Sequence, residues 1–399
     1  MLRRLLPPAV ATFAVGADGT VIAGLLPAIA ADLDVSVPAA GQLVTVFALT
    51  MALSAPVMGA FTSALDRRSA LLIALTVFVI GNVATALGTS YGAVMAARVV
   101  TAVGAGVITS AASSAAVAMA PPERRGRALA FVLGGLTLAS ALGLPLGALI
   151  GRADWHLALW SVAGAGLLAA VGIAVGLPRI PLPAASLTDR LRPLKQGRVL
   201  ALLAVTSLAF LGAYTLYTYI GPALRGPAGG DDSLLTLILL ASGVGTLAGN
   251  IAAGRLVDRH DPGRVLTAAL ALATLTLALT PLATRALAPT VIWAVVWGMT
   301  IGVIVVPQQH RLVSLGSTAA APVLLGLNSA ALYLGMALGG GFGGLAQKWL
   351  GLAPSELGPA AAGVTALALL WDVGANRRAA ASAPATRKPA PAAPERPAA

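Results

Sequence analysis

Runs of about 20 apolar residues recur along the whole of this 399-residue chain, and short segments that hold most of the charges separate them. A helix of that length and polarity crosses the hydrocarbon core of a bilayer. The composition agrees, since 58% of the residues are hydrophobic, only 10% are charged and the mean hydropathy is +0.88. The sequence therefore predicts an all-α integral membrane protein and excludes a soluble globular domain.

Twelve such runs are expected to form transmembrane helices. Their ranges are 8–31, 39–64, 69–88, 92–119, 127–150, 155–177, 198–221, 233–254, 264–283, 288–306, 321–346 and 358–374. The longest gap, 178–197, divides them six and six. We therefore expect one six-helix bundle over 1–177, a cytoplasmic linker over 178–197 and a second bundle over 198–375. The remaining tail, 376–399, is rich in Ala, Pro and Arg and is predicted to be disordered.

The basic residues indicate the orientation. With the N-terminus inside, 21 of the 26 Lys and Arg residues fall in inside segments, four fall in outside loops, and Arg98 lies within the fourth span. The positive-inside rule thus predicts that both termini are cytoplasmic. The net charge of +12 does not indicate nucleic-acid binding, because no basic stripe with interleaved aromatics occurs. With no cysteine and no Walker-type motif, neither a metal site nor a cofactor nor ATP-driven transport is expected.

A spacing of 192 residues relates the two halves. It separates Asp66 from Asp258, Gly143 from Gly335 and Gly147 from Gly339. A loop and a helix face that share one offset indicate a parallel duplication of a six-helix unit. That is the pattern of the major facilitator fold, whose substrate site lies at mid-membrane between the halves. We expect these glycines, together with Pro145, to act in helix packing and as hinges rather than to bind substrate.

Asp18 is the one acidic residue deep inside a predicted span. It lies about ten residues into the first span, hence roughly 15 Å into the membrane. A charge there is costly and marks a functional site, so Asp18 is a candidate proton carrier. Its candidate counterpart is Arg98, which shares one face of the fourth span with Thr101 and Thr109. That face is expected to line a cavity or contact a partner, unless Arg98 binds helix-end carbonyls near the outer interface.

The offset gives the second half a different role. Residues 192 positions after Asp18 and Arg98 are Phe210 and Thr290, so the second half does not repeat the intramembrane charges. We therefore expect proton coupling in the first half and an apolar, aromatic substrate surface in the second. Candidates for that surface are Tyr214, Tyr217, Asn328 and Tyr333. Tyr219 lies at a span end, where tyrosine more often anchors a helix at the interface.

Several segments carry a family resemblance. They are "AGLLPAIAADL" (23–33), "ARVVTAVGAG" (97–106), residues 121–151, "YTYIGP" (217–222), "GRLVDR" (254–259) and "LNSAALYLGMALGG" (327–340). In these the chain resembles twelve-span drug:proton antiporters of the major facilitator superfamily, and it is similar to chloramphenicol-resistance exporters and arabinose- or nucleoside-efflux permeases. The resemblance implies that Arg98 couples proton release to substrate binding. This chain differs from the family at Gly19, where the closer relatives often have a glutamate.

The resemblance also implies a cytoplasmic gate after spans 2 and 8. Asp66, Arg67, Asp258 and Arg259 occupy the matching positions, although Thr62 replaces the usual glycine of the first loop. The alternative is a solvated loop whose arginines only obey the positive-inside rule.

The leading functional hypothesis is proton-coupled export of a small apolar or amphipathic molecule, with antibiotics among the candidates, by alternating access in the bacterial plasma (inner) membrane. The expected partners are this substrate, protons and the lipid bilayer, and the protein is expected to be a monomer and not an enzyme. One alternative is import or export of a sugar, nucleoside or amino acid, which needs more hydrogen-bonding side chains in the core. Another is a non-transporting membrane scaffold or sensor, which the two intramembrane charges disfavour.

Overall fold

The computed structural model describes residues 2–62, 65–121, 124–151, 154–180, 187–316 and 320–381. These residues form helices, turns and short connections, with no β-strand among them. The predicted linker therefore lies partly outside the described residues, at 181–186, as does most of the predicted tail, at 382–399.

The first half holds six long helices, and a short linker region follows them. The helices are α1 (Leu2–Asp32), α2 (Val37–Phe61), α3 (Arg67–Ala86), α4 (Tyr91–Met119), α5 (Arg125–Ile150) and α6 (Trp155–Gly176). The linker region contains the short helices α7 (Leu187–Leu191) and η3 (Arg192–Lys195).

The second half contains another set of long helices with short helices between them. The long helices are α8 (Gly197–Tyr217), α10 (Asp232–Arg259), α11 (Pro262–Ala278), α13 (Leu287–Val313), α14 (Ala321–Leu350) and α15 (Leu357–Ala381). The short helices are α9 (Ile220–Leu224), α12 (Thr280–Ala283) and η4 (Pro354–Glu356).

Twelve of these helices correspond to the twelve predicted spans. Eleven are long and apolar enough to cross a membrane by length and composition. The twelfth, α11, is a shorter apolar helix that α12 follows almost directly. The prediction of an all-α membrane protein with twelve membrane helices is confirmed.

Several helices extend further than the hydrophobic pattern predicts, three of them by five or more residues at the C-terminal end. Helix α10 continues to Arg259, α13 to Val313 and α15 to Ala381. Polar residues at a helix end can reach the headgroup region, so hydropathy alone places these ends too early. Residues 376–381, which the sequence assigns to a disordered tail, are helical.

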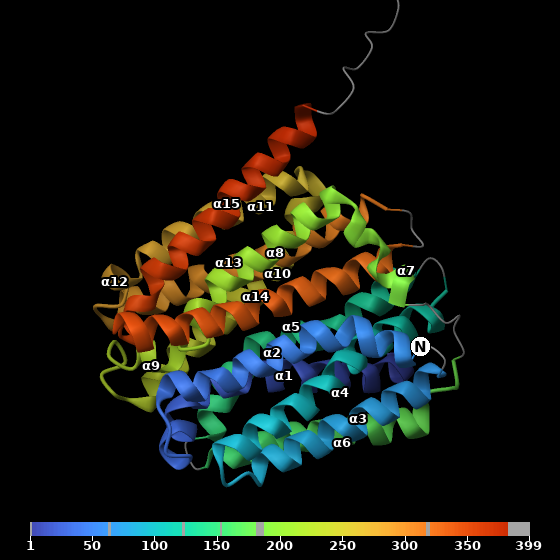
Figure 1. Ribbon diagram of the computed structural model, residues 1–399, viewed down its shortest axis with the longest axis horizontal. Coiled ribbons are helices and arrows are strands. Elements are labelled where there is room, and N and C mark those ends of the chain that lie inside the picture. Colours follow the sequence, from blue (N-terminus) through green and yellow to red (C-terminus); the bar gives the residue numbers. More distant parts are fainter. Residues whose placement is uncertain are drawn as a thin grey trace, which may run out of the picture.

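The two halves use the same internal contacts. In the first half α1 packs on α5 and α6, α2 on α4, and α3 on α4 and α6. In the second half α8 packs on α14 and α15, α10 on α13, and α11 on α13 and α15. Pairs α2–α14 and α5–α10 join the halves, and Figure 1 shows α2 and α14 side by side between them.

The bundle has two distinguishable ends. Figure 1 shows the N-terminus and α7 at one end, here called the linker end, and α9 and α12 at the other, here called the α9 end. Successive long helices run between these ends in alternating directions, which is the arrangement that short connections impose.

Close helix contacts at glycine hold each half together. Gly143 and Gly147 of α5 lie against Ala17 and Val21 of α1. In the second half, Gly335 and Gly339 of α14 lie against Phe210 and Leu211 of α8. A side chain at any of these glycines would meet the facing helix, which is the contact that small residues permit in membranes. Pro145 is buried within α5, which stays helical through it.

A further glycine contact, between α10 and α13, was not predicted. Each helix carries a glycine pair four residues apart, and each glycine faces a carbonyl oxygen of the other helix. Gly245 and Gly249 face Val295 and Met299, and Gly298 and Gly302 face Ser242 and Thr246. The first half lacks this arrangement, since position 57 is Val where Gly249 has its counterpart 192 residues earlier.

This contact generates a stability prediction. Gly249→Ala places a Cβ against the Met299 carbonyl oxygen, and overpacking of this kind costs about 1–3 kcal/mol. We expect a lower midpoint of thermal unfolding in detergent. Gly254→Ala on the same helix is the control, because a Cβ there meets no atom within 4 Å and alanine favours the helix. Equal midpoints for the two variants would contradict the proposed contact.

Candidate functional site

An ion pair buried at the centre of the first half forms the core of the candidate site. Arg98 of α4 donates from Nη1 to Asp18 Oδ1 of α1 at 2.8 Å and from Nη2 to the Asp18 carbonyl oxygen at 3.4 Å. The side chains are 0% exposed for Asp18 and 1% for Arg98. The structure therefore brings together the two charges that the sequence placed within the membrane.

Helices α2 and α3 complete the surroundings of this pair. The Arg98 guanidinium carbon lies 4.3 Å from the centre of the Phe47 ring of α2, which is a cation–π contact. The Asn82 amide of α3 lies close to the Asp18 carboxylate and donates to the Phe78 carbonyl oxygen at 3.2 Å. Sequence reasoning missed both residues, and the available signal for Asn82 was an amide in the middle of an apolar run.

The pair is incompletely satisfied. Among the described residues, Asp18 Oδ2 and Arg98 Nε have no hydrogen-bond partner, although both are buried. A buried polar atom without a partner costs free energy, and such atoms are uncommon unless they serve a purpose. Asp18 Oδ2 is therefore an available position for a proton.

A second buried arginine–carboxylate pair provides a contrast. At the linker end of the second half, Arg311 of α13 donates from Nη1 to Asp372 Oδ1 of α15 at 2.5 Å. Asp372 Oδ2 accepts from the Thr267 hydroxyl at 2.6 Å and from the Asn376 amide at 3.2 Å. Both carboxylate oxygens are occupied, so this pair ties α11, α13 and α15 together and leaves no position open. No role was predicted for this pair from the sequence.

Aromatic rings form a continuous row in the second half. The ring centres of Tyr214 and Tyr217 on α8 are 4.8 Å apart, and Tyr217 lies 5.9 Å from Trp297 on α13. Phe210 extends the row at one end and Trp293 extends it at the other. The predicted residues Tyr214 and Tyr217 thus belong to a larger aromatic cluster that is buried in this structure, and the two tryptophans four residues apart could have indicated it.

Tyr333 connects this surface to the ion pair. Its hydroxyl, on α14, lies within electrostatic range of Asp18 and of Tyr214. A residue of the second half therefore interacts electrostatically with the buried carboxylate of the first half.

Two residues predicted for the substrate cavity lie elsewhere. Thr101 is fully buried against Gly81 of α3 and donates to the Ala97 carbonyl oxygen, so it faces a helix contact. Asn328 is 1% exposed and accepts from the Thr206 hydroxyl at 2.8 Å, which satisfies it between α8 and α14. Position on a helix face did not reveal which neighbouring helix covers that face. Thr109 is half-buried and donates to the Ala105 carbonyl oxygen.

The structure places the residues predicted for the first gating loop at the start of α3. Asp66 is the N-cap of α3, where the hydrogen bond from the Ser69 hydroxyl, with the backbone amides of Ser69 and Arg68, holds its pKa below the usual range. Arg67 is buried, and its backbone N–H donates to the Ile180 carbonyl oxygen.

In the second half, the residues predicted for the gating loop lie at the end of a helix instead of at the start of the next one. Asp258 and Arg259 are exposed residues in the last turn of α10, and Asp261 is the N-cap of α11. Asp66 and Asp261 therefore hold equivalent positions, because each is the N-cap of the helix that follows. The offset of 192 residues instead pairs Asp66 with Asp258. Helix α10 extends further toward the linker end than its counterpart α2, and these extra residues explain why the two N-caps are not 192 residues apart.

The halves approach each other closely on the α9 side of the ion pair. The Tyr219 hydroxyl donates to the Gly340 carbonyl oxygen at 3.0 Å and accepts from the Gln42 amide of α2 at 3.4 Å. A Cβ on Gly41 would lie 2.5 Å from the Tyr219 ring, and one on Gly340 would lie 2.7 Å from the Thr45 hydroxyl. Tyr219 therefore contributes to contact between the halves as well as lying at a span end.

Comparison with known proteins places the chain in a family. The family model for the Major Facilitator Superfamily matches residues 9–340. The chain belongs to the Major Facilitator Superfamily. It is therefore a multi-pass membrane protein of a transporter family, and the predicted major facilitator fold is confirmed.

Three relatives and one solved structure illustrate the range of this family. An uncharacterized MFS-type transporter YbcL of Bacillus subtilis (strain 168) is 34% identical, with 86% of this chain and 89% of the relative covered. The inner membrane transport protein YdhP of Escherichia coli (strain K12) is 33% identical, with 85% and 87% covered. A chloramphenicol resistance protein of Streptomyces lividans is 35% identical, with 65% and 68% covered. The crystal structure of a D-xylose-proton symporter shares the fold, with a TM-score of 0.75, 19% identity, and 93% and 97% covered.

The incomplete ion pair generates a second prediction. Asp18→Asn leaves the buried Arg98 charge without its counter-ion, and breaking one side of a buried pair costs about 3–5 kcal/mol. We expect Asp18→Asn to lower the thermal midpoint in detergent more than the double variant Asp18→Asn/Arg98→Gln, which removes both charges. If the double variant is the less stable one, the pair does not act through charge compensation.

The contact at Tyr219 generates a third prediction. Because the chain has no cysteine, a cysteine introduced at Thr45 would be its single thiol. Tyr219→Ala is expected to increase the rate at which a membrane-impermeant thiol reagent labels that cysteine, because it removes a ring that closes the α9 end. Tyr91→Ala is the matched control, since the Tyr91 hydroxyl donates to the Ala39 carbonyl oxygen within the first half. Similar rates in both variants would rule out closure by Tyr219.

Proposed function

We propose that this chain is a proton-coupled exporter of small apolar or amphipathic molecules that works by alternating access. The observation that carries the proposal is the Asp18–Arg98 pair, which is fully buried within the first half and leaves one carboxylate oxygen without a hydrogen-bond partner. The chloramphenicol resistance protein among the relatives supports export as the direction.

The chemistry of the pair suits proton exchange. In the paired state Asp18 is ionised and the site carries no net charge. A proton that enters binds at Oδ2, and the neutral carboxyl then no longer compensates Arg98. The uncompensated guanidinium is costly in the membrane, so loss of the proton and re-formation of the pair are favoured on the opposite side. One proton moving down 100 mV supplies about 2.3 kcal/mol for this cycle.

The second half favours an amphipathic substrate over a sugar. Its polar residues satisfy one another between helices, as Thr206 does with Asn328 and as Ser207 does with the Ala331 carbonyl oxygen. The aromatic row Phe210, Tyr214, Tyr217, Trp297 and Trp293 is left as the principal recognition surface. Aromatic rings bind flat or apolar groups with little need for hydrogen bonds.

The positive-inside rule assigns the linker end to the cytoplasm. On that orientation, the contacts of Tyr219 close the outward-facing side in this structure. Rocking of one half against the other would then open the α9 end and expose the ion pair to the outside.

A transport assay in proteoliposomes tests the proposal. With chloramphenicol as the first substrate and a panel of amphipathic antibiotics after it, we expect substrate movement to drive protons in the opposite direction. Asp18→Asn should abolish accumulation driven by a pH gradient and retain substrate exchange without one. Asp372→Asn is the matched control, because that carboxylate is buried and paired but has no free oxygen; it should remain coupled.

Two outcomes would overturn the proposal. If Asp18→Asn still accumulates substrate in response to the gradient, Asp18 is not the proton carrier. If the wild-type protein moves protons in the same direction as the substrate, the chain is an importer.

A further inference from the structure

Helix α10 carries an exposed apolar stripe that ends in two arginines. Val244, Leu247 and Ile251 are 57%, 36% and 51% exposed and follow one another at helical spacing. The next two positions on the same face are Arg255 and Arg259, both exposed. This face therefore changes from apolar to basic as α10 approaches the linker end.

Helix α5, from the other half, has the same pattern. Leu138 and Phe131 are 43% and 37% exposed and lie on one face. Toward the linker end that face continues with Arg127 and Arg124, and Arg125 lies beside them, all three exposed. Both helices thus carry an apolar stripe that leads to arginine.

The register of the two helices puts these arginines at one depth. Helices α5 and α10 run in opposite directions and touch where Gly243 meets the Ala141 carbonyl oxygen. From that contact to Arg255 and Arg259 the rise along α10 is about 18 and 24 Å. From the same contact to Arg127 and Arg124 the rise along α5 is about 21 and 26 Å. The basic groups therefore flank the α5–α10 seam at the linker end.

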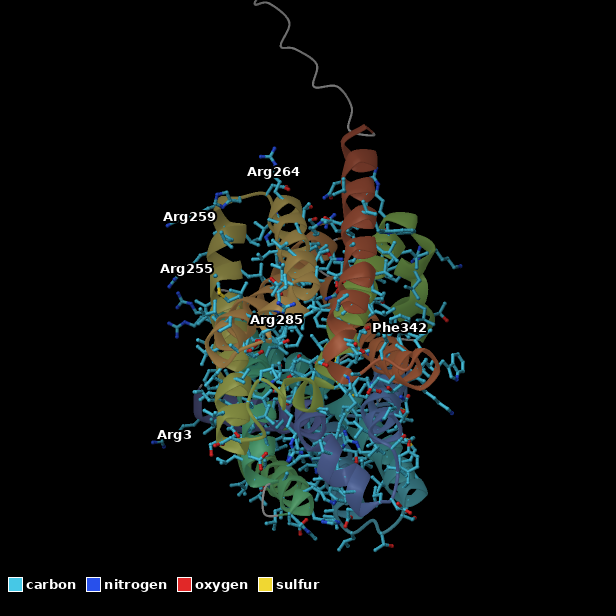
Figure 2. The ribbon with its side chains drawn as sticks, turned by 90° about the vertical axis from the view of Figure 1, so that its left-hand side faces the viewer. Arg3, Arg255, Arg259, Arg264, Arg285 and Phe342 are labelled. Carbon is cyan, nitrogen blue, oxygen red and sulfur yellow. The ribbon has the colours of Figure 1, made fainter. Side chains whose placement is uncertain are left out.

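The figure supports this placement. Figure 2 shows Arg255 and Arg259 projecting from the same side of the molecule as Arg3. Arg3 belongs to the first turns of α1, which packs along α5. Arg3 of the first half and Arg255 and Arg259 of the second half therefore share one lateral side of the bundle.

Protein carboxylates do not neutralise this group. No arginine among 124, 125, 127, 255 and 259 forms an ion pair with another residue in the described part of the chain. Asp258 lies beside Arg259 on α10, and Glu123, which precedes Arg124, lies outside the described residues. An excess of positive charge remains on an exposed surface that borders lipid.

We propose that the linker end of the α5–α10 seam binds anionic phospholipids of the adjacent leaflet. The phosphate groups bind the arginines, whose guanidinium fork matches phosphate oxygens, and the acyl chains lie on the two apolar stripes. A free phosphate would satisfy the charge but would leave the stripes without a ligand, so the occupant is a lipid.

This site bears on the movement of the halves. Closing the linker end would bring like charges on α5 and α10 toward one another, which raises the electrostatic energy at short range. Anionic headgroups between them offset that repulsion and thereby favour the state that is closed at the linker end. The inference concerns lipid and does not depend on which molecule is transported.

Native mass spectrometry of the full chain tests lipid binding directly. The seam variant is Arg127→Gln/Arg255→Gln/Arg259→Gln, and the matched control is Arg179→Gln/Arg192→Gln/Lys195→Gln, whose residues are exposed but lie off the seam. With phosphatidylglycerol and phosphatidylcholine of identical chains, we expect at least a fivefold preference for phosphatidylglycerol in wild type and control. The seam variant should fall to within twofold.

Two further measurements separate loss of charge from loss of folding, and lipid binding from binding of free phosphate. Lysine at the same three seam positions keeps the charge and should restore the preference, which separates loss of charge from loss of folding. Inorganic phosphate at the same concentration should not displace phosphatidylglycerol. A seam variant with the wild-type preference, or displacement by equimolar phosphate, overturns the proposal.

A distance measurement tests the effect on the halves. Spin labels at Ala130→Cys and Leu256→Cys report the separation of α5 and α10, since the chain has no other cysteine. In nanodiscs we expect phosphatidylglycerol to increase the population with shorter distances in wild type but not in the seam variant. Identical distributions in both lipids would overturn the coupling of lipid to closure.

Discussion

The hydrocarbon core of a bilayer offers no hydrogen bonds, and this constraint decides where each polar group of the chain lies. Most hydroxyls within the helices donate to a carbonyl one turn back, as Thr101 does to Ala97. Others cross to a neighbouring helix, as Thr206 does to Asn328. A few buried polar atoms of the described residues have no partner, and Asp18 Oδ2 is the one that belongs to a carboxylate.

The fold is symmetric and its chemistry is not. Both halves use the same five helix contacts, and both pack a glycine-bearing helix against the first helix of the half. Only the first half has a charged pair at its centre, and at the matching depth the second half has aromatic rings. A duplication explains the scaffold, and later divergence left a charged pair in one half and aromatic rings in the other.

The sequence predicted the elements that the bilayer itself dictates. Helix positions follow from the thickness of the hydrocarbon core, and Asp18 and Arg98 were expected to meet because neither can face lipid. The roles of Thr101 and Asn328 could not be predicted, because a helix face does not reveal which neighbour covers it. The α10–α13 glycine contact was missed for a different reason. A repeat shows only the positions that both halves share, and the residues 192 positions before Gly245 and Gly249 are Leu53 and Val57.

The geometry also suggests how protonation reaches the interface between the halves. Arg98 lies against Phe47, and Phe47 is two residues from Thr45, which borders Gly340 of the other half. Helix α2 therefore touches the ion pair and the opposite half within a single turn. When the pair opens, the guanidinium must change its position on the Phe47 ring, because an uncompensated charge seeks other partners. In the proposed cycle, a shift of α2 would act directly at the contact between Thr45 and Gly340, and this contact would give a local change of charge a short mechanical route to the movement of whole halves.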